Sequence, residues 1–401
     1  MRLKILQVAG WLDPKFGGPP KVCVGQALEL AHRGHEVSIL STQAPNELIL
    51  ESKQLEEAGI AVHAFPIRWP HQLRDAPELN LFLKRNIQDY DVAHIHCVWE
   101  RCLSNTAQAA RTNGIPYVVA THGMVDAWSM RKPKRYKKDI IGGLLGNWRM
   151  LRNASAIQVG SADESKEAKA AGLGGNHVII PNGIHPVEVS PLTVRQVKRE
   201  LYRRFPKLSE PGPVIIFFGR YHPKKGIDLL LRAFKSVSQE FPTAKVLCVG
   251  IKDDSEYLQG LRAFVSDAQL SDRVFITTDF VGPDAAAALA LGTIYAHPAH
   301  QEGFSTAILD AMLMSLPLLL TDRCRMRQLE SKDAGYIVSA SESGLESGLR
   351  RMLVQSGDDL SAMGRAAHNW MRSEFTWNAV GDQLVGLYRE LLESRAQVSS
   401  T

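Results

Sequence analysis

Two carboxylates, Glu302 and Asp310, stand eight positions apart on either side of a predicted helix start. Ser305 and Thr306 are strong N-cap residues, and the residues from 307 to 314 are good helix formers. The unpaired amides at such a helix start attract an anion. A carboxylate accepts two hydrogen bonds at once, which suits the vicinal hydroxyls of a sugar or ribose ring. The segment therefore predicts a site where a sugar ring lies next to an anion.

Two cations stand in a comparable position upstream. An apolar strand predicted over 214–218 ends in Gly219-Arg220, and Lys225-Gly226 opens the next predicted helix. Both cations thus lie on a strand-to-helix crossover, where doubly wound folds bind their ligands. Taken alone, either pair of charges is more often an ordinary surface feature. Both pairs in order, each after a strand, favour a phosphate and sugar site in the second half of the chain.

Two further candidates lie in the first half. Gly17-Gly18 falls between the first predicted strand and a helix that Pro19 or Pro20 could open, which makes it a second candidate anion cradle. A glycine-rich turn without a ligand is an equally good interpretation. His122 follows an apolar strand at its carboxyl end, where ligands bind, although a histidine that bonds only loop backbone is the alternative.

Short strands alternate with helical segments along the chain, which predicts an α/β fold of parallel sheets covered by helices. The pattern pauses in a polar stretch, 187–213, and then resumes. We therefore expect two domains with a boundary within 181–190. The strands are expected near 3–9, 36–41, 60–65, 92–97, 116–121, 155–160, 177–180, 214–219, 244–250, 273–277, 293–297 and 317–321.

The composition agrees with two globular domains, because 401 residues with 45% hydrophobic content can form two cores. The net charge of +5 is mild, so no nucleic-acid partner is expected. The five cysteines lack a Cys-x-x-Cys spacing, which favours free thiols in a reducing cytosol. The first residues enter a strand at once, and no apolar run reaches the roughly 20 residues of a spanning helix. We expect a cytoplasmic protein with at most peripheral membrane attachment.

Seven short segments, in order, resemble the retaining GT-B glycosyltransferases of family 4, a group that includes bacterial exopolysaccharide and lipopolysaccharide transferases. Each segment alone is a weak match, but together they cover essentially the whole chain. They are Gly17-Gly18-Pro19-Pro20, Gly34-His35-Glu36-Val37, Asp91-Val92-Ala93-His94-Ile95-His96, Thr121-His122-Gly123-Met124, Pro181-Asn182-Gly183-Ile184, Gly219-Arg220 with Lys224-Lys225-Gly226, and the segment from Glu302 to Asp310.

The resemblance implies a GT-B fold, in which two Rossmann-like domains with parallel sheets face each other. It assigns residues 1–185 to an acceptor domain and residues 186–375 to a nucleotide-sugar domain. It also implies that the last helix, 376–394, packs back on the N-terminal domain, whereas the sequence pattern shows only that this helix is amphipathic.

The implied reaction moves a sugar, with retention of configuration, from a nucleoside-diphosphate sugar to a glycan or polyprenyl-diphosphate-linked acceptor in cell-surface polysaccharide synthesis. Arg220 and Lys225 would neutralise the departing diphosphate. Glu302 would position the donor sugar, and His122 would lie beside it. A leaving-group oxygen serves as the base in this family, so we assign no protein base. The donor-binding residues are expected to be Gly17, Gly18, Gly303, Phe304, Ser305, Thr306 and Asp310.

No cofactor and no metal is expected besides the donor. His94 and His96 share one face of a strand, but the sequence places no third zinc ligand beside them. Asp89-Tyr90-Asp91 precedes a strand instead of following one, so a solvated turn is a better interpretation than a metal site.

Three positions depart from the family pattern. Asp310 stands where Glu is usual and reaches one methylene less far, Ser305 stands where Gly is usual, and His185 stands where an acidic residue is usual. Two alternatives remain open. One is a non-catalytic paralogue that binds a nucleotide sugar, and the other is a sugar-nucleotide epimerase of the same fold, for which the sequence places no acid and base.

Residues 131–138 carry six cations in eight positions. A charge run of this density is usually a solvated face. Its position shortly after His122, in the expected acceptor domain, favours contact with an anionic membrane surface, since each Lys or Arg there contributes about 1 kcal/mol. We therefore expect peripheral binding to the inner face of the cytoplasmic membrane.

Overall fold

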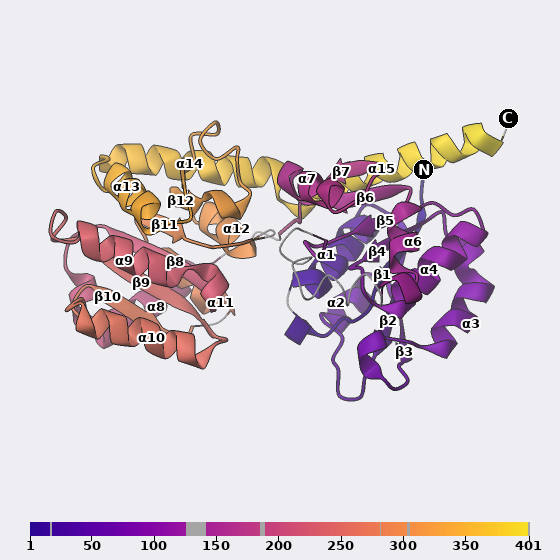
Figure 1. Cartoon of the computed structure of the whole chain (residues 1–401), viewed down its shortest axis with the longest axis horizontal. Coiled ribbons are helices and arrows are strands. Elements are labelled where there is room, and N and C mark those ends of the chain that lie inside the picture. Colours follow the sequence, from indigo (N-terminus) through magenta and orange to yellow (C-terminus); the bar gives the residue numbers. More distant parts are fainter. Residues whose placement is uncertain (17, 126–141, 185–188, 281, 303–304, 400–401) are drawn as a thin grey trace. The chain divides into compact units, whose positions relative to one another are not determined.

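The computed structural model describes the whole chain except residues 17, 126–141, 185–188, 281, 303–304 and 400–401. The chain forms two compact units, each with its own parallel sheet (Figure 1). Unit 1 comprises Met1–His185 and Thr376–Thr401, and unit 2 comprises Pro186–Phe375. The predicted α/β class with two parallel sheets is confirmed, because every strand pair in both sheets is parallel.

The central strands of the unit 1 sheet are short, mostly apolar runs that are buried on both faces, as is usual for parallel sheets covered by helices, whereas its two edge strands are largely half-exposed. Its strands are β1 (Lys4–Ala9), β2 (Glu36–Gln43), β3 (Ala61–Pro66), β4 (Val92–His96), β5 (Tyr117–Ala120), β6 (Ala156–Val159) and β7 (His177–Ile179). Their order across the sheet is β3-β2-β1-β4-β5-β6-β7.

Helices cover both faces of this sheet. Leu6 and Val8 of β1 join a buried cluster with α3 and α4, while Leu3 and Ile5 join another with α1 and α15, as the two-residue period of a strand requires. The helices are α1 (Gly18–His32), α2 (Ser52–Glu57), α3 (Pro77–Asn86), α4 (Arg101–Thr112), α6 (Asn147–Arg152), α7 (Ala162–Ala170) and α15 (Trp377–Ser399).

The last helix, α15, belongs to the core of unit 1. Trp377, Val380 and Tyr388 are buried against α1 and the sheet. A Cβ placed on Gly25 of α1 would lie 2.2 Å from the Trp377 ring, so glycine lets the two helices pack closely.

Unit 2 has the sheet order β10-β9-β8-β11-β12-β13. Its strands are β8 (Val214–Tyr221), β9 (Lys245–Lys252), β10 (Val274–Thr277), β11 (Ile294–His297), β12 (Leu318–Thr321) and β13 (Gly335–Val338). Its helices are α8 (Pro191–Arg204), α9 (Ile227–Val237), α10 (Ser255–Asp267), α11 (Gly282–Leu289), α12 (Thr306–Leu313), α13 (Glu342–Leu353) and α14 (Gly357–Glu374).

Two elements of unit 2 were missing from the predicted pattern. The edge strand β13 has four residues and is mostly half-exposed, so its apolar signal is short. The helix α8 lies in the polar stretch that was predicted to interrupt the pattern, and it buries only Val197 and Leu201. Neither element shows a long apolar stripe, which is the feature that makes a strand or a helix readable from sequence.

In both sheets, the order in which successive strands are added reverses beside the first strand. In unit 1 the first strand, β1, lies between β2 and β4, and in unit 2 the first strand, β8, lies between β9 and β11. Doubly wound folds bind ligands beyond the carboxyl ends of the strands at such a point. The predicted site residues should therefore be sought at the ends of these strands. No helix in the described part of the chain is both long and apolar enough to cross a membrane.

Candidate active site

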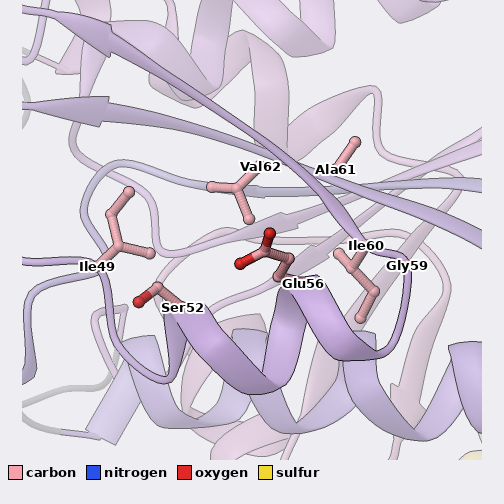
Figure 2. Close-up of a pocket in the computed structure, with 7 residues that line it drawn as sticks. All are labelled: Ile49, Ser52, Glu56, Gly59, Ile60, Ala61 and Val62. Atoms are coloured by element: carbon pink, nitrogen blue, oxygen red, sulfur yellow. The ribbon is translucent and has the colours of Figure 1, made fainter.

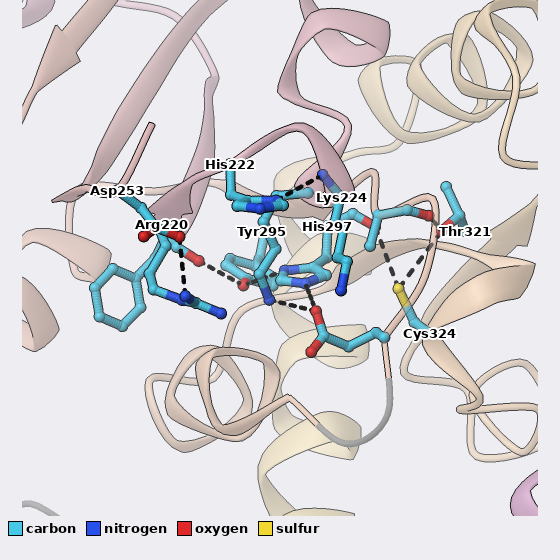
Figure 3. A network of polar contacts seen from close by, with 12 residues as sticks. Arg220, His222, Lys224, Asp253, Tyr295, His297, Thr321 and Cys324 are labelled. Atoms are coloured by element: carbon cyan, nitrogen blue, oxygen red, sulfur yellow. Dashed lines mark hydrogen bonds and ion pairs between the residues drawn. The ribbon is translucent and has the colours of Figure 1, made fainter. Parts of the chain in front are cut away.

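Arg220 lies near the carboxyl end of β8, with 64% of its side chain exposed. Its Nη1 donates to Oδ2 of Asp253, 2.9 Å away, which follows β9 (Figure 3). Parallel pairing of β8 with β9 brings these two positions together. An ion pair this exposed contributes little to stability, so an anionic ligand could displace Asp253 at small cost.

Lys225 and Glu302 are 77 residues apart in the chain and form an ion pair between Nζ and Oε2. The turn η5 (Pro223–Lys225) ends at Gly226, which has a φ of +63°. A Cβ on Gly226 would lie 2.1 Å from the carbonyl oxygen of Pro298, so glycine is required for this turn to pack beside the loop after β11. That packing brings the predicted cation onto the predicted carboxylate.

Glu302 is held ionised by its neighbours. Burial alone would raise the pKa of Glu302, but a hydrogen bond from His297 and the charge of Lys225 lower it to about 2. The His297 Nε2 lies 3.1 Å from Oε2 of Glu302, and the Glu302 amide donates to the Arg323 carbonyl at 3.1 Å. Burial lowers the pKa of His297, so this imidazole is neutral.

The helix α12 begins at Thr306, as predicted, with Ser305 as its N-cap residue. The Ser305 side chain makes no capping hydrogen bond, which differs from the behaviour expected of a strong N-cap. The amides of the first turn are therefore not covered by that hydroxyl. Asp310 lies in this helix and is half-exposed. Gly303 and Phe304 lie outside the described residues.

In unit 1, His122 follows β5 with a φ of +47°, an uncommon conformation for a residue other than glycine. Its Nε2 lies 3.0 Å from Nδ1 of His96, and the His96 Nε2 lies 2.7 Å from Oε1 of Gln7. The surrounding side chains desolvate His122 and lower its pKa to about 4. His122 thus bonds a side chain, His96, and its place beside the donor sugar stays a prediction.

Glu164 of α7 fixes the turn around His122. Its Oε1 accepts from the Thr121 hydroxyl at 2.7 Å and from the Gly123 amide at 2.8 Å, and its Oε2 accepts from the Gly160 amide at 2.7 Å. These bonds satisfy a buried carboxylate and hold both neighbours of His122. The strained backbone is thus supported by the first turn of α7, the helix that follows β6.

Of the glycine pair after β1, the structure describes Gly18. Gly18 is the first residue of α1, and a Cβ there would meet nothing within 4 Å, so the space beside it is open. The helix therefore begins one residue before the prolines that were expected to open it. Gly17 lies outside the described residues, as do residues 131–138.

The predicted site residues fall in both units. His122 and Gly18 belong to unit 1, whereas Arg220, Lys225, Glu302, Ser305, Thr306 and Asp310 belong to unit 2. Sequence reasoning gave no supporting role in the site to the side chains that hold them. These supporting residues are Gln7, His96, Glu164, Asp253, Tyr295 and His297. Three of them, His96, Tyr295 and His297, show a sequence signal, which is a polar ring that alternates with other residues along a strand.

The pair His94 and His96 serves a polar network. His94 Nδ1 lies 2.6 Å from the hydroxyl of Tyr388 on α15, and the ring of His94 stacks on that of His96 with centroids 4.9 Å apart. Among the described residues, no three His, Cys, Asp or Glu side chains gather closely enough to hold a metal ion.

A separate surface pocket lies between α2 and the amino end of β3 (Figure 2). It is lined by Ile49, Ser52, Glu56 and residues 59–62. Ligands of doubly wound folds bind at the carboxyl ends of the strands, whereas this pocket lies at the amino end of a strand. This pocket is therefore not the candidate active site.

Two family models match most of the chain. "Glycosyl transferase 4-like domain" matches residues 17–183, and "Glycosyl transferases group 1" matches residues 212–355. With the two parallel sheets and the resemblance of the ordered segments, these matches define the class. The chain belongs to the GT-B glycosyltransferases of family 4.

Individual relatives are more distant. A GDP-mannose-dependent alpha-(1-6)-phosphatidylinositol monomannoside mannosyltransferase of Mycobacterium tuberculosis (strain CDC 1551 / Oshkosh) is 24% identical over 96% of this chain and 98% of its own length. A phosphatidyl-myo-inositol mannosyltransferase of Mycobacterium leprae (strain TN) is 24% identical over 97% of this chain and 98% of its own length. These proteins span the same length as this chain.

Solved structures share the fold at low identity. HepE of Anabaena in complex with UDP aligns with a TM-score of 0.73 and 18% identity, over 97% of this chain and all of HepE. Sucrose-phosphate synthase of Thermosynechococcus elongatus aligns with a TM-score of 0.73 and 18% identity, over 98% and 100%. At this identity the likeness concerns the fold alone.

Proposed function

We propose that the chain transfers a sugar, with retention of configuration, from a nucleoside-diphosphate sugar to a lipid-linked or glycan acceptor in the synthesis of cell-surface glycans. The observation that carries this proposal is the Lys225–Glu302 pair, because it brings a phosphate-binding cation and a hydroxyl-binding carboxylate into contact at the carboxyl ends of β8 and β11. The family membership supplies the class of reaction.

The donor diphosphate would bind by exchanging ion pairs. In the structure, Arg220 forms an ion pair with Asp253, and Lys225 forms one with Glu302. A diphosphate offers more negative charge than either carboxylate, so it competes for both cations, with first-turn amides of α12 that the Ser305 hydroxyl leaves uncovered as further donors. Once Lys225 moves to the phosphates, the Glu302 carboxylate is released toward the hydroxyls of the donor sugar. Asp310, further along α12, would accept from the ribose.

The chemical step breaks the bond between the anomeric carbon and the diphosphate oxygen and forms a bond from that carbon to the acceptor oxygen on the same face. The proton of the acceptor hydroxyl passes to the departing diphosphate oxygen, so no protein base is needed. Arg220 and Lys225 stabilise the charge that builds on that diphosphate, which is a large term in catalysis of this kind. The family resemblance implies a place beside the donor sugar for His122 as well.

The relatives' names suggest where to begin. Since two of them are named as phosphatidylinositol mannosyltransferases, one of them dependent on GDP-mannose, the first donor to test is GDP-mannose, and the first acceptors are phosphatidylinositol and its monomannoside. Polyprenyl-diphosphate-linked glycans are the second class of acceptor. Either lipid would place the enzyme at the inner face of the cytoplasmic membrane, bound peripherally.

The test is a screen followed by product analysis. Thermal shifts with GDP-, UDP- and ADP-sugars identify the donor, because a ligand that binds the folded state raises the melting temperature. The anomeric configuration of the product is then read by NMR. A retained configuration supports the proposal, and an inverted product contradicts it. An isomerised donor would indicate an epimerase, and binding without turnover would indicate a non-catalytic paralogue.

We also propose that turnover needs no divalent cation, because two side-chain cations and helix amides already neutralise the diphosphate. Turnover should be the same in a chelator as in added Mg²⁺. A loss of activity in chelator that added metal restores would overturn this part alone.

A further inference from the structure

His297 is a buried histidine that contacts the candidate active site but belongs to none of the predicted motifs. It ends β11, and its side chain has no exposed surface. Tyr295, two residues earlier, lies on the same face of the strand, and their rings stack with centroids 5.8 Å apart (Figure 3). The ring of Phe217 on the neighbouring β8 also stacks on His297, with ring centroids 5.8 Å apart. Packing between these rings leaves the imidazole little freedom to turn.

Only one assignment of donors and acceptors satisfies both hydrogen bonds of the His297 ring. The ionised Glu302 carboxylate can only accept, so the Nε2 of His297, 3.1 Å from Oε2, must carry a proton. Since the buried imidazole is neutral, Nδ1 carries none. The Tyr295 hydroxyl, 2.8 Å from Nδ1, therefore donates to it, in preference to the Phe218 carbonyl at 3.3 Å.

Glu302 thus has one oxygen held from two sides. Both Lys225 Nζ and His297 Nε2 bond to Oε2, and the bonds that the described residues make to this carboxylate involve that oxygen. Among the described residues, Oε1 is thus the carboxylate oxygen that can accept from a ligand. If a diphosphate draws Lys225 away, His297 is the group that still holds Oε2.

We propose that His297 is a positioning residue that keeps the Glu302 carboxylate oriented toward the donor sugar after Lys225 has moved to the diphosphate. Tyr295 sets the tautomer that makes this possible. The proposal rests on the proposed function, because it assigns His297 to the sugar-binding step of that reaction. It predicts that loss of His297 weakens recognition of the sugar and leaves recognition of the nucleoside diphosphate intact.

The first test needs no ligand. Imidazole ¹⁵N NMR of the free protein, with the His297→Gln variant used for assignment, should show His297 protonated at Nε2 and unprotonated at Nδ1. The Tyr295→Phe variant should reduce this preference. An Nδ1-protonated ring or an imidazolium at neutral pH overturns the proposal.

The second test compares two ligands of one pair, a nucleotide sugar and its nucleoside diphosphate, in the wild type and in three variants. In His297→Leu the Kd of the nucleotide sugar should rise about 10-fold, which corresponds to about 1.4 kcal/mol, while the Kd of the diphosphate changes less than about two-fold. In His297→Gln, whose amide can still donate to Glu302, most of the affinity should return. His368→Leu, a substitution on α14 in the same unit, is the control and should leave the ratio of the two constants unchanged.

The outcomes separate this inference from the function on which it rests. Equal weakening of both ligands in His297→Leu, or no weakening of either, overturns the positioning role. If the wild type binds none of the nucleotide sugars, the proposed function fails, and the NMR test alone then decides whether His297 holds Glu302.

Discussion

Nε2 of His122 lies 3.0 Å from Nδ1 of His96. His96 is the last residue of β4 and pairs in the sheet with Ala120, the last residue of β5, so the turn that follows carries His122 back over its neighbour. Through Gln7 on β1, the same polar network reaches the Tyr388 hydroxyl on α15, 3.5 Å from the Gln7 Nε2. A buried chain of neutral rings therefore supports the candidate catalytic histidine, and it makes the stability of unit 1 depend on pH.

We expect unit 1 to lose stability as the pH falls from about 6.5 toward 4. Burial lowers the pKa of His94 to about 3 and that of His122 to about 4, and it also lowers the pKa of His96. In the unfolded chain these rings take up protons near pH 6.5, so the unfolded state binds more protons throughout this window. The stabilisation is complete above pH 6.5 and is lost as the pH falls through the folded values.

The measurement is the melting temperature of the wild type and of His94→Leu between pH 7.5 and 4.5. The wild type should fall more steeply than the variant in this range. The exposed His32→Gln on α1 is the matched control and should follow the wild type. Parallel curves for wild type and His94→Leu would contradict the prediction.

Glu100 should make the protein less stable as the pH rises, which is the opposite of the effect of the histidines. Burial is the main cause that raises the pKa of this carboxyl to about 7, and its Oε2 has no partner among the described residues. Because the folded value exceeds the unfolded one, the stabilisation is complete below about pH 4.5 and is lost as the pH rises through 7. Glu100→Gln should therefore stabilise the protein by about 2 kcal/mol at pH 8 and by little at pH 4.5.

Chemical denaturation at both pH values checks this prediction. The exposed Glu57→Gln on α2 serves as the control and should change stability equally at both. A Glu100→Gln protein that is less stable than the wild type at pH 8 would show that the ionised carboxylate has a partner.

Arg220 and Lys225, the two cations proposed to bind the donor diphosphate, should be needed for turnover. Arg220→Ala or Lys225→Ala should lower kcat/KM by about 100-fold or more, as expected when a major transition-state contact is lost. Steady-state kinetics with the identified donor provide the measurement. Lys235→Ala, at the far end of α9, is the control. Near wild-type rates in both site variants would reject this assignment.

Asp310 should tolerate a longer acid but not its removal. If this carboxylate meets the ribose diol, Asp310→Glu restores the reach usual in the family and should keep the donor KM within about three-fold of the wild type. Asp310→Ala should raise the donor KM about 10-fold, because the ribose hydroxyls lose their acceptor. Equal effects of the two substitutions would show that Asp310 does not contact the ribose.

The basic run at 131–138 should bind anionic membranes. Its six cations predict salt-sensitive binding to vesicles that contain an anionic lipid, at low ionic strength. Sedimentation with such vesicles is the measurement. Binding should be lost, with the melting temperature unchanged, when five residues are changed to Gln: Lys132, Lys134, Arg135, Lys137 and Lys138.

The control for this experiment has the same charge change elsewhere in unit 1. Five exposed lysines are changed to Gln: Lys21, Lys53, Lys84, Lys166 and Lys169. If both variants lose binding equally, the attraction comes from net charge and not from the basic run.

The sequence by itself determined the class of fold and the placing of the main site residues. Strand and helix signals are local, since each depends on the spacing of apolar residues and on glycine or cap residues within about ten positions. Arg220 at the end of β8, Lys225 before α9 and Asp310 within α12 follow from such patterns. The ordered motifs then indicated the family.

Only the tertiary structure decided which side chains meet. Lys225 bonds Glu302, 77 residues away, because the strand order places β8 beside β11. Tyr388 bonds His94, 294 residues away, because the last helix packs on unit 1. Hydrogen bonds need partners within about 3 Å and in the right direction, and these depend on strand register and helix packing. No local pattern specifies them. The role inferred for His297 thus follows from the contacts that the fold creates.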